Sequence, residues 1–288
     1  MIKFGVAGNS ESFYAEGHTS TVEAALWCKN RGIDMFEYSF GKGVNVGHKT
    51  AAEIGKEFLL HGIEMSVHAP YYINFANPDP DMIDKSIMYI VNSIKKLKAF
   101  NCGDRVVFHP GAQGKAERTD AFRLLKDNIM RLIETLEALK MTDFRICCET
   151  MGKVSQMGTI EEVAEIVNLA PFIYPCIDFG HLNARTIGHM NSKEDYKGAI
   201  NYLLDHLPFE KVRDTHIHFS KIMYGSRGEI KHLTFEDNLY GPNFEPLAEV
   251  IAENKLEPRI ICESDGTQAE DAVEMKNIYK RFMVNFQA

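Results

Sequence analysis

The amino-acid sequence predicts an α/β fold in which eight parallel strands, each followed by a helix, close into one barrel. Eight short apolar runs alternate along the chain with eight segments whose apolar residues recur at helical spacing. The chain has 288 residues, close to the roughly 250 of such a barrel. No linker rich in proline, glycine or serine divides the series. We therefore expect a single (β/α)8 TIM barrel domain over residues 1–288. An open doubly wound sheet would carry GxGxxG after its first strand, and that motif is absent.

Four of the strands are expected in the first half of the chain. They are residues 2–7, 35–40, 64–67 and 105–108, and the later helices of this half are residues 51–60, 82–100 and 119–139. Thr19 or Ser20 caps the first helix, which runs to Lys29 before a glycine. The helix 82–100 has the clearest periodicity, with isoleucine, valine and leucine on one face, and Gly103 follows its end.

The second half contains the other four strands. They are residues 145–149, 174–177, 212 to about 217, and 259–262, and the helices are residues 160–169, 192–207, 244–253 and 268–283. Thr159 caps the helix 160–169, whose first turn carries two glutamates that favour the helix dipole. The segment 220–242 is expected as a long loop without secondary structure. Loops of this length are uncommon in compact domains and usually functional.

Composition limits the class of protein and its partners. The chain is 45% hydrophobic and 25% charged, as soluble globular proteins are. It shows neither a signal peptide nor a membrane-length apolar run, so we expect a cytoplasmic monomer without a membrane partner. A net charge of −8 gives no general attraction to nucleic acid. The six cysteines form no CxxC pair, and we expect free thiols.

Residues of metal-ligand type stand where the expected strands end. Because the C-terminal ends of all strands in a parallel barrel open at one mouth, residues far apart in sequence converge there. The strand-end residues are His68, His109, Glu149, Asp178, His216 and Glu263. His181 follows Asp178 by one turn, and the segment 220–242 adds Glu229 and His232. So many imidazoles and carboxylates exceed the needs of one ion and suit Zn²⁺, Mn²⁺ or Fe²⁺. They predict a multinuclear site in which Glu149 bridges two ions, an arrangement suited to phosphoester cleavage.

Each of these residues also has an ordinary structural explanation. A single strand-end histidine is more often a hydrogen-bonded structural residue, and a single carboxylate can cap the next helix. The prediction therefore depends on the whole set. His218 remains ambiguous, because it faces the same way as His216 from two residues further along the strand. Four cysteines just inside the strand ends are interpreted as small buried apolar residues instead of ligands. They are Cys147, Cys148, Cys176 and Cys262.

Seven short motifs occur in order between residues 66 and 264. They are SVHAPYYINFA, VVFHPGAQ, CCETMG, CIDFGH, THIHFSK, GSRGEIKHL and IICES. As a set they resemble the endonuclease IV family of abasic-site endonucleases (AP endonuclease family 2), within the xylose isomerase-like TIM barrels. Each motif alone is weak, whereas their order and spacing are specific.

The resemblance implies two or three zinc ions and a role for each strand-end residue. For the first ion the implied ligands are His68, His109 and Glu149. Glu149 bridges this ion to the second, whose other ligands are Asp178, His216 and Glu263. The ligands of the third ion are His181, Glu229 and His232. The family hydrolyses the phosphodiester 5′ to abasic sites in duplex DNA during base excision repair. Glu149 or Glu263 would then position the attacking water. Tyr71 and Tyr72 match the family position that wedges into the DNA stack at the lesion.

Two departures from the family pattern concern the ligands. The chain has Glu229-Ile-Lys-His232 where well-known members have Asp-x-His, and His216-Ile-His218-Phe where they have His-Leu-Asn-Asp. The first changes a ligand of the third ion. The second makes His218 a further candidate ligand or substrate contact. In addition, the loop after the second strand offers only two lysines for DNA.

A sugar isomerase or epimerase of the same fold is the alternative function. In it Glu149, Asp178, His216 and Glu263 would hold a single divalent ion. The remaining ligand candidates distinguish the two functions, because one ion does not need them. They are His68, His109, His181, Glu229 and His232.

Overall fold

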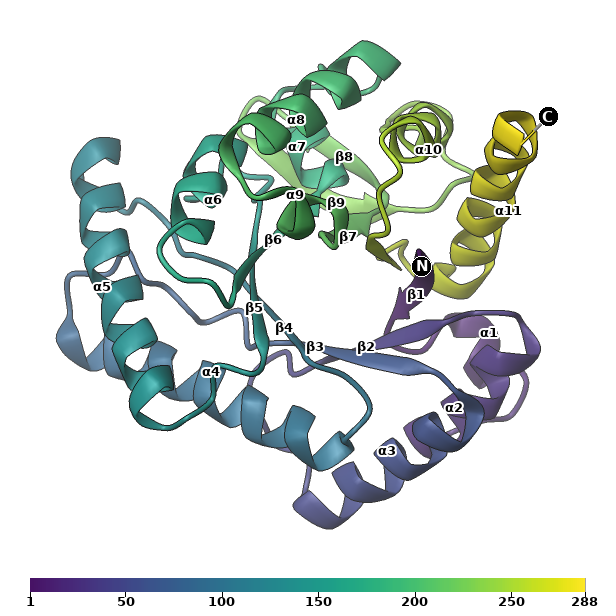
Figure 1. Ribbon diagram of the computed structural model, residues 1–288, viewed down its shortest axis with the longest axis horizontal. Coiled ribbons are helices and arrows are strands. Elements are labelled where there is room, and N and C mark those ends of the chain that lie inside the picture. Colours follow the sequence, from purple (N-terminus) through teal and green to yellow (C-terminus); the bar gives the residue numbers. More distant parts are fainter. Residues whose placement is uncertain (288) are drawn as a thin grey trace.

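Eight parallel strands close into a barrel, and helices surround it (Figure 1). The computed structural model describes residues 1–287, with side chains to residue 283. The strands are β1 (Lys3–Ala7), β2 (Met35–Ser39), β3 (Glu64–His68), β4 (Arg105–Phe108), β5 (Arg145–Glu149), β6 (Ile173–Asp178), β7 (His216–Phe219) and β10 (Arg259–Cys262). Around the barrel the order is β1, β10, β7, β6, β5, β4, β3 and β2. The predicted (β/α)8 TIM barrel is confirmed.

The eight expected helices are present. They are α2 (Thr21–Asn30), α3 (His48–His61), α4 (Pro80–Phe100), α5 (Arg118–Ala138), α6 (Ile160–Val167), α8 (Lys193–His206), α10 (Phe244–Glu253) and α11 (Gln268–Gln287). Capping boxes at Ser20 and Thr159 begin α2 and α6. Three short helices were not expected: α1 (Glu11–Ala15), α7 (Phe179–Arg185) and α9 (Phe209–Arg213). None of the helices within residues 1–287 is long and apolar enough to cross a membrane.

The position of β7 differs from the sequence-based expectation. A strand was expected over residues 212–217, but α9 occupies the first part of that range and β7 begins only at His216. Pro208 is the N-cap residue of α9, and the helix begins directly after it. The Nζ of Lys211 then fixes the helix by donating to three backbone carbonyls at 3.0, 2.9 and 2.8 Å. As a result β7 ends at Phe219, and His216 lies at its start.

The segment 220–242 is not the structureless loop that its length suggested. It contains the antiparallel hairpin of β8 (Lys221–Gly225) and β9 (Gly228–Leu233). The backbone N–H of Glu229 donates to the carbonyl of Gly152 at 3.2 Å, so the hairpin is joined to the loop that follows β5. It therefore presents its side chains to the mouth of the barrel.

Alternate residues along each strand serve two different environments. One set packs against the helices; on β7 these are Ile217 and Phe219. The other set faces the inside of the barrel, where Val107, Cys147 and Cys176 form a small apolar group. His216 and His218 belong to this inward set, and both are fully buried. The inward residues at the C-terminal ends of the strands include the side chains that were predicted as ligands.

Candidate metal centre

Glu149, the last residue of β5, lies at the centre of the mouth and is 1% exposed. Four imidazoles surround its carboxylate: the Nε2 atoms of His68 and His109 lie 3.0 and 3.1 Å from Oε2. The Nδ1 atoms of His181 and His218 lie 3.3 and 3.2 Å from Oε1. Burial alone would raise the pKa of Glu149, but these imidazoles, His218 and His109 foremost, hold it well below its usual value. A buried anion is thus available to cations on both of its oxygens.

The first group of donor atoms comprises His68, His109 and Glu149, which lie within 4.8 Å of one another. The Nδ1 of His68 is 2.9 Å from the carbonyl oxygen of Ala69, which can only accept a hydrogen bond. Nδ1 therefore donates to this carbonyl, and Nε2 is the nitrogen that could bind an ion beside Glu149. Such an anchored imidazole is the usual arrangement of a metal-binding histidine.

The second group comprises Glu149, Asp178, His218 and Glu263, also within 4.8 Å. Asp178 caps α7 through Oδ1, which accepts from the backbone N–H of His181 at 2.7 Å. Its Oδ2 is fully buried and has no hydrogen-bond partner among the described residues, because Nδ1 of His181, 3.2 Å away, donates to the carbonyl of Thr150 instead. A buried carboxylate oxygen without a donor is costly unless a cation meets it. This observation fits a divalent ion held by these four residues.

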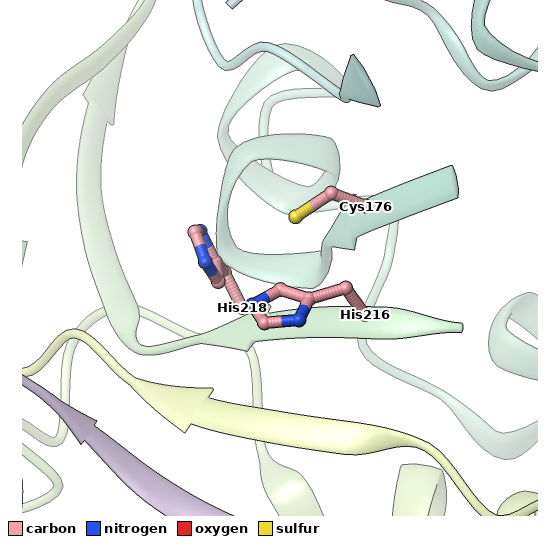
Figure 2. A group of neighbouring side chains, drawn as sticks. All are labelled: Cys176, His216 and His218. Atoms are coloured by element: carbon pink, nitrogen blue, oxygen red, sulfur yellow. The ribbon is translucent and has the colours of Figure 1, made fainter. Parts of the chain in front are cut away.

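The sequence predicted His216 as the histidine of the second group, but His218 is the histidine that lies within 4.8 Å of its carboxylates. The role of either residue as a ligand stays a prediction. Because β7 starts at His216, that residue pairs in register with Cys176, whereas His218 pairs with Asp178 at the strand end. Figure 2 shows both imidazoles on the inner face of β7, with the Cys176 sulfur directed toward them. The Nε2 of His216 bonds instead to Oε2 of Glu37 at 3.0 Å, deeper in the barrel.

The third group comprises His181, Glu229 and His232, again within 4.8 Å. The Nδ1 of His181 donates to the carbonyl of Thr150 at 2.9 Å, which leaves Nε2 to face Glu229 Oε2 at 3.5 Å. The Nδ1 of His232 lies 2.8 Å from the buried hydroxyl of Ser220. The β8–β9 hairpin thus brings two donors, Glu229 and His232, next to His181 in the first turn of α7. Glu229 stands where the family pattern has aspartate.

Glu37, in the middle of β2, is the buried charge that the sequence analysis missed. It is 1% exposed and contacts His216, His218 and Ser66 inside the barrel. Burial would raise its pKa, but His218 and then His216 hold the pKa well below the usual value. A glutamate in the middle of the apolar run MFEYS was the available signal, since such strands rarely carry an unpaired charge.

The cysteines near the strand ends do not join the centre. Burial raises the pKa of Cys147 and Cys262 to about 12 and that of Cys148 and Cys176 well above its usual value. Cys147, Cys148 and Cys262 belong to none of the groups of possible metal donors among the described residues, and Cys176 belongs only to a deeper group with His216 and His218. The donor set of the mouth is therefore nitrogen and oxygen, which suits Zn²⁺, Mn²⁺ or Fe²⁺.

A cavity of about 410 Å³ opens over the three groups. Most of the predicted ligands line it, together with Lys153, Gln156 and Tyr71. Tyr71 and its neighbour Tyr72 are each 47% exposed, and their ring centroids are 4.5 Å apart. The mouth thus combines a buried set of metal donors with an aromatic pair at its rim.

Comparisons with known proteins give one matching family profile, described as xylose isomerase-like TIM barrel, over residues 25–280. "Uncharacterized protein MJ0133" of Methanocaldococcus jannaschii is 32% identical over 279 residues, 96% of each chain. "Probable endonuclease 4" of Staphylococcus saprophyticus is 33% identical over 179 residues, 59% of this chain and 57% of that protein. The chain therefore matches little more than half the length of this endonuclease.

Solved structures of several activities share the fold. "D-tagatose 3-epimerase-like protein" has a TM-score of 0.68 and 20% identity, covering 98% of this chain and 97% of that one. "SacUVDE" has a TM-score of 0.69 and 14% identity, covering 98% and 99%. The IOLI protein, solved "with a binding zinc atom", has a TM-score of 0.65 and 17% identity, covering 99% and 97%. At these identities the similarity shows the fold alone.

Proposed function

The chain belongs to the xylose isomerase-like TIM barrel family, and from this premise we propose that it is a metal-dependent phosphodiesterase that hydrolyses DNA on the 5′ side of abasic sites. The observation that carries the proposal is the number of donor groups at the mouth. Glu149 belongs to two groups of ligands, and a third group stands beside them. Two or three zinc ions would use all of these donors, whereas a single ion would leave most of them without a purpose.

The residues divide the chemical work according to their contacts. Ions held by the three groups would supply positive charge for the phosphate and acidity for the attacking water. Both oxygens of Glu149 are engaged by imidazoles, and Glu149 belongs to two of the groups, so it would serve as a ligand shared by two ions. Glu263 has one imidazole contact, 3.4 Å from His218, and it lines the cavity. Glu263 is thus the carboxylate better placed to orient the attacking water.

The tyrosine pair supports a substrate with an unpaired base or an exposed sugar. Tyr71 and Tyr72 follow β3 closely and stand half-exposed at the rim, where an aromatic ring can stack on a base. The chain as a whole carries a net charge of −8, which opposes DNA. Two or three divalent ions at the mouth would reverse the local sign where the carboxylates converge. DNA binding is therefore expected to require the ions.

An incision assay on duplex DNA with one abasic analogue, performed on protein of measured metal content, tests the proposal. We expect two or three zinc equivalents, a single cut on the 5′ side of the analogue, and loss of cutting on chelation. Tyr72→Ala is expected to retain the metal and to raise KM by about tenfold, since one base stack is worth ~1–3 kcal/mol. Intact DNA in the presence of a full metal complement would refute the nuclease.

A second candidate function is the epimerisation or isomerisation of a ketose. It is favoured by the group of Glu149, Asp178, His218 and Glu263, which is complete for a single divalent ion without the other donors. The fold shared with an epimerase-like protein adds no information on substrate. One metal equivalent, no DNA cleavage and turnover of free ketoses would establish this function in place of the nuclease.

A further inference from the structure

We propose that Glu37 is the positioning residue that makes His218, and not His216, a metal ligand. The proposal rests on the metal centre of the proposed function and concerns how the protein builds its second ion site. Glu37 touches neither the cavity nor the predicted substrate. It acts through the imidazole of His218 from the side opposite the donor carboxylates.

The carboxylate of Glu37 is held between three inward-facing side chains. Oε2 accepts hydrogen bonds from Oγ of Ser66 at 2.7 Å and from Nε2 of His216 at 3.0 Å. Oε1 lies 2.9 Å from Nε2 of His218. This last contact has the distance of an ion pair without the alignment of a full hydrogen bond. All four side chains are buried, so water does not screen the interaction.

The two nitrogens of His218 face opposite partners. Nδ1 lies 3.2 Å from Oε1 of Glu149 and 3.4 Å from Oε1 of Glu263, on the side of the second group. Nε2 lies on the side of Glu37. A cation among the donor carboxylates requires a lone pair on Nδ1, so the proton must reside on Nε2. The negative charge of Glu37 favours that tautomer and fixes the ring orientation, as carboxylates behind metal-binding histidines do.

His216 differs because its imidazole is committed to Glu37. Its Nε2 donates to Oε2, and the ring lies one inward position deeper than His218. Cys176, His216 and His218 could themselves hold an ion, since their donor atoms lie within 4.8 Å (Figure 2). One contact opposes this arrangement: the carboxylate of Glu37 already faces the Nε2 atoms of both imidazoles. The geometry assigns this deep group to support of the site above it.

Metal titration of Glu37→Gln tests the proposal without any nuclease assay. The glutamine amide can donate to Nε2 of His218 and would place the imidazole proton on Nδ1, where it blocks the ion. We expect one of the bound zinc or cobalt ions to be held about 10- to 100-fold more weakly than in the wild-type protein, with the others unchanged. Competition with a chromophoric chelator measures the affinities, and the cobalt absorption spectrum reports the change in coordination.

Glu64→Gln is the matched control. Glu64 is also a glutamate of a barrel strand, but it lies at the N-terminal end of β3, away from the mouth, and is paired with Lys3 and Arg259. We expect its metal affinities to equal those of the wild type. Glu37→Asp keeps the charge and guards against a folding failure of the amide variant. It is expected to retain more affinity for the weakened ion than Glu37→Gln and less than the wild type.

Several outcomes would overturn the proposal. They are unchanged affinity in Glu37→Gln or Glu37→Asp, or equal weakening of all ions in properly folded protein. Loss of an ion in Cys176→Ser, together with loss of a thiolate-to-cobalt absorption band, would also overturn it by locating an ion in the deep group. If the wild type binds its ions but leaves abasic DNA intact, the proposed function fails while the role of Glu37 is still decided by the titration.

Discussion

The two ends of the barrel carry similar numbers of carboxylates but balance them differently. At the N-terminal ends of the strands the acidic residues are neutralised by basic side chains; we call this set the base network. Its members are Lys3, Glu64, Asp104, Arg105, Arg145, Asp214 and Arg259. At the mouth the carboxylates Glu149, Asp178, Glu229 and Glu263 meet imidazoles.

The two ends differ in the partners that the protein itself provides for their carboxylates. In the base network the buried guanidinium of Arg105 lies 2.7 Å from Asp214 and donates a further bond to its carbonyl. Guanidinium is charged at any pH of interest, so the carboxylates at this end always face positive side chains of the protein itself. At the mouth, Oδ2 of Asp178 has no hydrogen-bond partner among the described residues, and Nδ1 of His181, 3.2 Å away, donates to the carbonyl of Thr150 instead. This contrast supports the proposal that metal ions bind at the mouth, whereas the base network consists of ion pairs within the protein.

Glu149→Gln is expected to have the largest effect on function. The amide cannot bridge two ions, so the protein should lose at least one metal equivalent and its phosphodiesterase activity should fall by about 10³-fold or more. Metal analysis and the incision assay measure the two effects on the same preparation. Full activity in this variant would exclude Glu149 as a bridging ligand, and the mouth would then no longer differ from the base network in holding metal ions.

Arg105→Met is expected to have the largest effect on stability. It leaves Asp214 partly unpaired at the base and should lower the free energy of unfolding by about 3 kcal/mol, with the metal content of the folded protein unchanged. Denaturant unfolding measures the loss. Arg123→Met, which removes an exposed pair with Asp120, is the control and should cost less than about 0.5 kcal/mol. A metal-deficient but stable Arg105→Met protein would show that the two ends are not independent.

Two substitutions on β7 should show which of its two histidines is a metal ligand. His218→Asn is expected to remove one metal equivalent, because the second group loses its only nitrogen donor. His216→Asn should retain every equivalent, since that imidazole bonds to Glu37. The reverse pattern, measured by metal analysis of both proteins, would restore His216 as the ligand.

The smallest expected effect is a pH dependence confined to metal-free protein. Burial lowers the pKa of His68, but Glu149 opposes this and the net result is a rise to about 9. The folded pKa exceeds the unfolded value of about 6.5, so protonation stabilises the fold below that pH. This stability is lost as the pH rises through about 9. Unfolding of chelated protein should show the decrease, and zinc-loaded protein should not, because the ion replaces the proton. An identical decrease in both forms would contradict a ligand role for His68.

The sequence was sufficient to predict the barrel because each strand end carries its own signal. An apolar run such as Arg145–Glu149 is short, buried on both faces and ends in a polar residue, and these features do not depend on distant contacts. The convergence of His68, His109 and Glu149 then follows from the parallel geometry alone. The structure brings all three together as expected.

Three features depended on contacts that the sequence does not display. The start of β7 is set by α9 and by the bonds of Lys211 to distant carbonyls, and this moved the ligand position from His216 to His218. The β8–β9 hairpin is anchored to the loop after β5. Glu37 could be interpreted only once the imidazoles across the barrel were located.

The number of zinc ions that each chain binds tests the central claim most directly. Native mass spectrometry of the purified protein, before and after chelation and again after zinc is restored, gives this number without assuming a substrate. We predict two or three ions, all removed by the chelator and all recovered on restoration. A protein that binds one ion, or none, under these conditions would contradict a multinuclear centre at the mouth.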